Sequence, residues 1–368
     1  MKKIRSIFGL ILILTVLNNF TQVQAQNGFN IRFEPFKMTV YGADLHVGDK
    51  FEFYNELTGI PRNQNYNYGV NYDPIVIKLP SKINFAWEIT YRYPKASWRS
   101  GIRGWQFYSF NRNYGLVSSD EDFLRGVRMF GQTLIPITND QKERGISSVW
   151  WWGQNDLRLK KAEFFIALQT STISEVSFGL EAIQIKHKQN FGQEQWALIE
   201  EFYVWYDFNN HVTLMENDKS SYLGLGPSFG LNIKTKYFEG FLKQSIFLGQ
   251  AKYRGTWTDI DDIEIITRSN DSVYATALYD GQFPFKLKEL RAIPNTELSL
   301  KFIVRDKINE NISLDFGLGF MTSIFLDVPM SPRWSIPGDW IWRKGSNWST
   351  QEKNLFFTRW VTTLGITF

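Results

Sequence analysis

The chain has 368 residues, and its 41 Lys and Arg against 37 Asp and Glu give a formal net charge of +4. This near balance argues against a nucleic-acid partner. The chain contains no Cys, so neither disulfides nor attachment through a lipidated cysteine is possible, while 17% of its residues are aromatic.

The first 25 residues carry the pattern of a secretory signal peptide. Lys2, Lys3 and Arg5 precede an apolar run from Ile7 to Leu17, and a small-residue cleavage motif ends at Ala25. No later apolar run reaches the roughly 18 residues that a membrane-spanning helix needs. We therefore predict a cleaved signal peptide at residues 1–25 and a single domain at residues 26–368.

Four pairs of segments alternate apolar and polar residues with a period of two, on either side of a short polar turn. They lie at 83–93 and 98–110, 163–170 and 176–185, 223–234 and 241–253, and 297–304 and 312–324. This pattern is typical of β-hairpins whose two faces meet different environments. A first strand at 29–41 and a last strand at 355–368 bring the expected number to about ten.

The first expected strand changes parity near its middle. Apolar residues stand at Phe29, Ile31 and Phe33 and then at Phe36 and the alternate positions after it. Because a proline lies at the change and cannot donate a ladder hydrogen bond, we predict a β-bulge there.

Between the hairpins lie polar segments without helical periodicity, at 43–81, 111–156, 188–221, 255–294 and 327–354. An even number of strands places the short turns and both chain ends on one side, and these long segments on the other. The aromatic excess fits girdles at two membrane interfaces. We predict an all-β fold: a transmembrane antiparallel β-barrel of about ten strands, with short periplasmic turns and long extracellular loops. Hairpins hidden in the long segments would raise the number to as many as about sixteen.

The last strand alternates apolar and small or charged residues up to a terminal aromatic. In this respect it resembles the C-terminal signal strand of bacterial outer-membrane barrels. The resemblance implies the outer membrane of a Gram-negative bacterium, contact with its lipid, and insertion by the barrel assembly machinery. The candidate assembly-signal residues are Trp360, Leu364, Ile366 and Phe368.

A glycine-alternating stretch, YLGLGPSFGL from Tyr222 to Leu231, resembles a segment of the major-outer-membrane-protein family first known from Legionella. The likeness covers a short part of the chain. It implies a porin-like barrel and supplies no functional residues.

The alternation points charged side chains of both signs into the barrel, where they avoid the about 2–4 kcal/mol that Arg or Lys costs at mid-bilayer. Because a ten-stranded interior is narrow, we expect these side chains to pair and close the lumen. An ion or solute pathway is the alternative, which a wider barrel would favour. The candidate charge network is Glu88, Arg92, Arg103, Glu163, Glu181, Glu297, Lys301, Asp315 and Arg359.

Four tryptophans are clustered in the segment before the last strand: Trp334, Trp340, Trp342 and Trp348. Exposed aromatic rings at this density are unfavourable in water. They either bind a protein or glycan partner, or pack as a lid over the barrel mouth.

Ten-stranded outer-membrane proteases resemble the expected layout, and they carry acidic pairs and an Asp-His pair at the outer rim. Asp44-Leu45-His46 and Asp120-Glu121-Asp122 lie in expected outer loops, but their spacing and order differ from that family. We therefore expect a non-enzymatic protein without cofactor or metal, acting through its extracellular loops as a binding or scaffold subunit of an outer-membrane complex. A porin-like channel for small solutes or hydrophobic compounds is the alternative, and a surface-rim hydrolase is a second one.

Overall fold

The computed structural model describes residues 28–46, 51–55, 60–61, 76–93, 96–119, 127–129, 132–133, 145–202, 206–267, 272–309, 312–334 and 348–368. The expected signal peptide lies outside these residues. No helix in the described part of the chain is long and apolar enough to cross a membrane.

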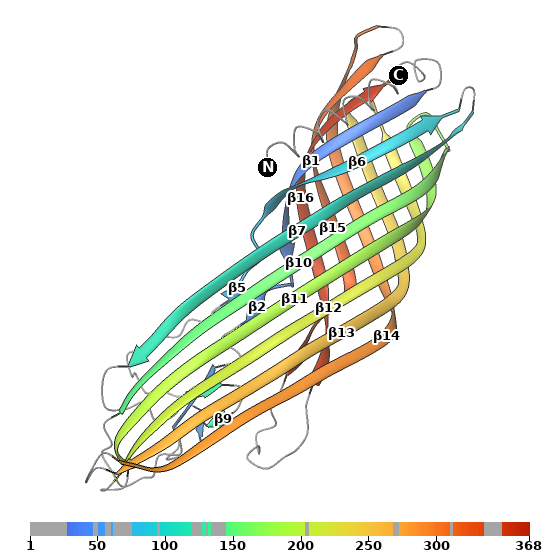
Figure 1. The fold of residues 1–368 in the computed structure, drawn as a ribbon. Helices are drawn as coiled ribbons and strands as arrows, with labels where there is room; N and C mark the ends of the chain where they lie inside the picture. The colour runs from blue at the N-terminus through green and yellow to red at the C-terminus, as the bar shows by residue number, and fades with distance from the viewer. Residues whose placement is uncertain are drawn as a thin grey trace, which may run out of the picture.

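Ten strands pair with antiparallel neighbours and close into a ring, because β1 pairs with both β6 and β16 (Figure 1). The ring confirms the predicted fold class and number of strands. Its members are β1 (Phe29–Tyr41), β6 (Lys82–Arg92), β7 (Trp98–Ser119), β10 (Gly145–Gln169), β11 (Ser174–Phe202), β12 (Tyr206–Lys234), β13 (Phe238–Thr267), β14 (Ser272–Lys307), β15 (Ser313–Trp334) and β16 (Trp348–Thr367). Short strands outside the ring are β2 (Leu45–His46), β3 (Phe51–Asn55), β4 (Ile60–Pro61), β5 (Val76–Ile77), β8 (Val127–Met129) and β9 (Gln132–Thr133).

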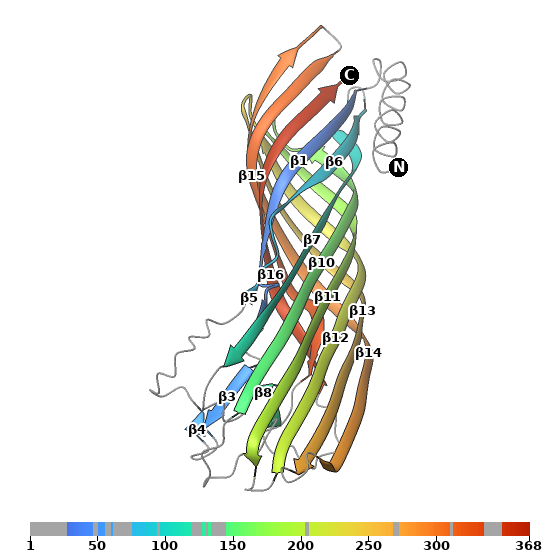
Figure 2. The same cartoon turned by 60° about the vertical axis from the view of Figure 1, so that its left-hand side comes forward.

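The two ends of the barrel differ. The four short turns join β6 to β7, β10 to β11, β12 to β13 and β14 to β15 at one end, which we call the turn end (Figures 1 and 2). There β16 finishes beside the start of β1, and the Phe368 N–H donates a hydrogen bond to the Phe29 carbonyl at 2.9 Å. We call the opposite end the loop end.

The prediction that residues 188–221 and 255–294 are irregular loops was wrong. β11 and β12 stay paired from Ser174 and Ile233 to Phe202 and Tyr206, and β13 and β14 pair as far as Thr267 and Ser272. These strands therefore continue far past the apolar part of the wall (Figure 1). Backbone hydrogen bonds can hold a sheet together even when neither face is apolar. The strands therefore continue beyond the point where the alternation of apolar and polar residues ends.

Side chains alternate between the outer wall and the lumen as predicted for the last strand. Trp360 and Leu364 face outward, with 69% and 44% of their surface exposed, whereas Arg359 and Phe357 face inward and are buried. The outer wall of the other strands carries large exposed apolar side chains as well, such as Leu318 at 68%. This apolar band is the surface that a barrel presents to lipid.

The predicted β-bulge at Pro35 is absent, because β1 keeps one register with both neighbours on either side of this residue. Even-numbered residues face the lumen throughout β1, from Arg32 to Val40. The pattern changes because the lumen itself changes from charged to apolar along the axis. The apolar residues of β1 therefore change from odd to even positions because the lumen becomes apolar, while the same positions continue to face the lumen.

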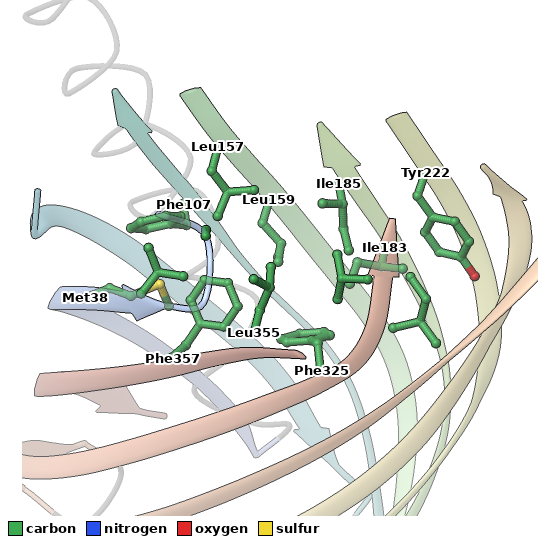
Figure 3. Close-up of a cluster of buried hydrophobic side chains, with 14 of the residues drawn as sticks. Met38, Phe107, Leu157, Leu159, Ile183, Ile185, Tyr222, Phe325, Leu355 and Phe357 are labelled. Atoms are coloured by element: carbon green, nitrogen blue, oxygen red, sulfur yellow. The ribbon is translucent and has the colours of Figure 1, made fainter. Parts of the chain in front are cut away.

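The apolar part of the lumen forms a hydrophobic plug (Figure 3). Side chains from β1, β7 and every strand from β10 to β16 meet inside the barrel and are buried. The plug consists of Phe36, Met38, Val40, Ala43, Leu79, Trp105, Phe107, Leu157, Leu159, Ile183, Ile185, Tyr222, Phe247, Ala251, Tyr253, Ile293, Phe325, Val328, Met330, Leu355, Phe357 and Val361.

Candidate functional site in the barrel lumen

A cavity of about 300 Å³ occupies the turn-end half of the lumen. Its lining includes Asn30 and Thr367 beside the chain ends, Lys234 beside a turn, and Trp105 and Arg359 at its inner end. We call this cavity the vestibule. Nine basic and six acidic side chains line it: Arg32, Arg92, Arg99, Arg103, Lys161, Lys234, Lys243, Lys301 and Arg359, with Glu34, Glu88, Glu163, Glu175, Glu239 and Glu297.

The deepest ion pairs form a buried cluster of two lysines and three glutamates. Lys161 Nζ lies 3.1 Å from Glu181 and 2.8 Å from Glu297, while Lys243 Nζ lies 3.1 Å from Glu297. Lys243 also lies 2.9 Å from Glu163 and contacts Glu181. Glu163 and Glu181 are opposite each other on β10 and β11, so the lysine between them neutralises a like-charge neighbour pair.

Further ion pairs join strands nearer the turn end. Arg32 reaches across the lumen to Glu239 at 2.7 Å and to Asp315 at 2.9 Å. Glu175 pairs with Arg92 at 2.6 Å and with Arg99 at 3.0 Å. Because every partner lies on a different strand, these bonds fix the cross-section of the barrel as well as its charge.

The structure places all nine residues of the predicted charge network inside the barrel. Arg103 bridges Glu88 at 3.8 Å and Glu163 at 2.5 Å, and Lys301 pairs with Glu34. The sequence reasoning missed Lys161, which stands two residues before the start of the strand predicted at 163–170. Extending the period of two by one step would have found it.

Arg359 differs from the rest of the network. Its side chain is buried, and no carboxylate of the described residues lies within ion-pair distance of it. Instead its guanidinium lies over the rings of Trp105 at 4.7 Å and Phe36 at 5.3 Å. Aromatic faces stabilise a desolvated guanidinium, so Arg359 marks the boundary between the charged vestibule and the hydrophobic plug.

Charge pairing was predicted to close the lumen, but the closure is mainly apolar. Two parts of the chain complete the plug, and we call them the lumenal insert. They are residues 43–46 with 76–80, which lie between β1 and β6, and residues 328–332 of β15, which lie at irregularities in its pairing with β16. Ala43, Ile77, Val328 and Ser331 are fully buried, and Met330 is 1% exposed.

Hydrogen bonds attach the lumenal insert to the wall. Asn155 Nδ2 on β10 donates to the carbonyl oxygens of Ala43 at 2.7 Å and Ile77 at 3.3 Å. The Ser220 hydroxyl on β12 donates to the carbonyl of Pro329 at 2.8 Å. These bonds satisfy backbone groups that burial would otherwise leave unpaired.

His187 on β11 connects the two parts of the insert. The Ser331 N–H donates to Nδ1 of His187 at 2.9 Å, and Nε2 lies 3.1 Å from the Asn155 side-chain oxygen. Since Nδ1 accepts, the proton lies on Nε2, which donates to Asn155. The ring is therefore neutral.

His187 lies past the apolar band, because the flanking Lys186 and Lys188 point outward and are exposed. Burial, together with the positive charge of Lys353, lowers the pKa of His187 to about 3. The sequence assigned none of these three residues to a site. Asn155 and Ser331 lie in segments that were interpreted as outer loops, and His187 lies just past the strand predicted at 176–185.

The four tryptophans of the predicted binding loop divide into two groups. Trp340 and Trp342 lie outside the described residues. Trp334 and Trp348 are paired at the end of the β15–β16 ladder, and the Trp348 ring stacks on Phe285 of β14 with centroids 5.4 Å apart. This contact crosses from β16 to β14, so Trp348 belongs to the packed mouth of the barrel.

The residues considered for an enzyme site are not brought together in the described part of the chain. Asp44 belongs to the lumenal insert, while residues 120–122 lie outside the described residues. Among the described residues, no group of three or more His, Asp or Glu could hold a metal ion.

The strand pairing defines the class of protein: a ten-stranded transmembrane antiparallel β-barrel. No family model matches the sequence, and no curated protein matches it. Solved structures that the chain is similar to include the outer membrane protease OmpT from Escherichia coli, with a TM-score of 0.33, 9% identity, and 93% of this chain and 96% of that chain covered. They also include the toluene transporter TodX of P. putida, with a TM-score of 0.20, 6% identity, and coverage of 92% and 89%. A FadL homologue from Pseudomonas aeruginosa has a TM-score of 0.22 and 7% identity, with 93% of this chain and 89% of that chain covered. All three are bacterial outer-membrane barrels, and their activities differ.

Proposed function

We propose that this protein is a closed outer-membrane barrel of a Gram-negative bacterium that acts as a non-enzymatic binding or scaffold subunit through its loop end. The turn end then faces the periplasm and the loop end faces the outside of the cell. The barrel anchors and orients the loop end, and its lumen carries no solute.

The hydrophobic plug is the observation that carries this proposal. Side chains from strands that are not neighbours meet inside the lumen, among them Phe107 on β7 and Phe357 on β16, whose ring centroids lie 5.8 Å apart. The Lys161, Lys243 and Glu297 cluster lies directly on the turn-end side of the plug. An ion entering the vestibule would have to lose its water in apolar surroundings, which is costly. A channel function would require the side chains of the plug to move apart.

Orientation is tested with epitope tags on whole cells. Tags near Asn139 and near Ser346 should be reachable by antibody, since both positions lie in segments that connect strands at the loop end. A tag near Asn309, in a turn at the turn end, should be reached only after the outer membrane is permeabilised. Labelling at Asn309 in intact cells would reverse the proposed orientation.

The binding role is tested in the segment between β15 and β16. Replacing Trp340 and Trp342 with Ala should reduce the recovery of whatever surface component is crosslinked to the wild type on whole cells. Trp87→Ala on the outer wall is the matched control, because it also removes a partly exposed tryptophan ring. Equal crosslinking by all three proteins, at equal surface levels, would rule out this segment as the binding surface. Trp348→Ala is expected to lower thermal stability instead, because its ring packs on Phe285.

A further inference from the structure

The outer wall of the barrel carries a dense group of basic side chains at the loop-end edge of the apolar band. Nine Lys and Arg residues on five consecutive strands, β10 to β14, point outward and are exposed. We call this group the basic patch. It consists of Arg158, Lys160, Lys186, Lys188, Lys219, Lys252, Arg254, Lys286 and Lys288.

Strand register places eight of these side chains in two adjacent rows across the sheet, and Lys160 lies in the next row toward the turn end. One row runs from Arg158 through Lys186 and Ser221 to Lys252 and Lys288. The next runs from Asp156 through Lys188 and Lys219 to Arg254 and Lys286. Figure 2 shows β10 to β14 side by side on one face of the barrel, so the two rows form a continuous surface.

Like charges face each other directly within these rows. Lys219 lies opposite both Lys188 and Arg254, and Lys252 lies opposite Lys288. Directly opposed residues on antiparallel strands have Cβ atoms about 5 Å apart, and like charges there destabilise the sheet.

Among the described residues, only Arg158 of the nine has an acidic partner, Asp156 at 3.0 Å. By contrast, the charges inside the lumen are almost all paired. The outer wall therefore holds a concentration of positive charge that the protein itself leaves largely uncompensated.

The position of the patch indicates which anion compensates it. One row closer to the turn end, the same strands expose Leu223 at 63% and Leu290 at 84%, and the row after it exposes Leu248 at 63%. Acyl chains of a lipid packed on these leucines would place its headgroup on the basic patch. Tyr108 is beside the patch, with the Arg158 guanidinium 4.6 Å from its ring, as is usual for aromatic residues at a membrane interface.

We propose that the basic patch binds the phosphate groups of a phosphorylated glycolipid of the outer leaflet. Lys and Arg form charge-assisted hydrogen bonds with phosphate oxygens, and two rows of them suit a headgroup with more than one phosphate. A soluble acidic protein would not need the patch to adjoin the apolar band. The proposal rests on the outer-membrane location and orientation proposed above, and it does not depend on whether the lumen is closed.

The test uses the full-length barrel purified in a neutral detergent, with bis-phosphorylated lipid A as the probe and native mass spectrometry as the readout. The patch variant is Lys219→Gln with Lys252→Gln. The matched control is Lys236→Gln with Lys307→Gln, which removes the same number of lysines at the turn end. At about 1 kcal/mol for each lysine at a membrane surface, the patch variant should bind lipid A roughly tenfold to thirtyfold more weakly. The control should bind like the wild type, and lipid A without its phosphates should bind the wild type about as weakly.

Two further measurements keep the result interpretable. Without lipid, the patch variant should unfold at the same temperature as the wild type or higher, because the substitutions relieve repulsion. Lys219→Arg with Lys252→Arg should restore binding, since the charge is kept. Wild-type binding of lipid A by the patch variant would overturn the proposal, as would equal binding of the dephosphorylated lipid; the patch would then be open to an acidic protein. If the wild-type barrel conducts ions but the patch variant still binds lipid A more weakly, only the closed-lumen function is refuted.

Discussion

At the scale of single residues, the stability of the barrel depends on how completely its buried charges are paired. Glu297 accepts from Lys161 at 2.8 Å and lies 3.1 Å from Lys243, and all three side chains are at most 3% exposed. Removing one member of a buried ion pair leaves the other charge desolvated and uncompensated. Here one glutamate serves two lysines, so its loss affects both.

We therefore expect Glu297→Gln to lower the free energy of unfolding by about 3–5 kcal/mol. Glu194→Gln should cost no more than about 1 kcal/mol, because the side chain of Glu194 is 44% exposed and its ion-pair partner among the described residues is His211. Unfolding midpoints in urea with the barrel in detergent compare the two. Equal midpoints for both variants would show that the lumen charges are solvated in place and contribute little.

At the scale of structural elements, the lumenal insert depends on a neutral histidine. Burial and Lys353 hold the pKa of His187 at about 3, below its usual 6.5. The unfolded chain therefore binds one more proton than the folded barrel between these two values. The stability that this group contributes is fully present above pH 6.5 and is lost as the pH falls toward 3.

We expect the wild type to lose about 2 kcal/mol of stability through this group between pH 6.5 and pH 5. His187→Gln keeps a neutral hydrogen-bonding side chain and should lose correspondingly less over the same interval. Thermal unfolding at the two pH values, compared between the proteins, isolates His187 from the lumen carboxylates that both share. The same pH dependence in the two proteins would mean that another group accounts for it.

The terminal strand is the second element with a direct prediction. Deleting Phe368, or replacing it with Ser, should strongly reduce insertion into the outer membrane, because we interpret the aromatic end of β16 as an assembly signal. Surface levels and heat-modifiable migration in gels measure the loss. Thr367→Ser, a conservative change next to it, should insert normally. Normal insertion of the variant without Phe368 would show that this residue is not an assembly signal.

The sequence predicted the elements of the barrel well where lipid lies on one side of the wall. In those segments apolar and polar residues alternate, as from Phe356 to Leu364, and the ten strands could be counted. Past the apolar band both faces are polar, so 188–221 carried no period and was wrongly predicted as a loop. The change of side-chain type at Phe36 was wrongly interpreted as a bulge, because the period alone does not show that the lumen changes character. The contacts of His187 with Asn155 and Ser331 join residues far apart in the chain, so no local sequence pattern predicts them.

At the scale of the whole molecule, the two halves of the lumen and the outer wall differ in the kind of side chain that they carry. The vestibule holds paired charges and is open only toward the turn end, and the hydrophobic plug closes the loop-end half. The outer wall changes from apolar to basic within one row of side chains on β14 and within two rows on β12 and β13. Under the proposed function, the apolar wall anchors the barrel and the loop end faces the outside of the cell.

The closed lumen is tested most directly by the single-channel conductance of the purified wild-type protein in a planar lipid bilayer. We expect no current steps, because the plug leaves no hydrated path past the cluster of Lys161, Lys243 and Glu297. A variant with Val328, Met330 and Phe357 changed to Gly serves as the positive control and should open measurable steps. Regular porin-sized steps from the wild type would contradict the account.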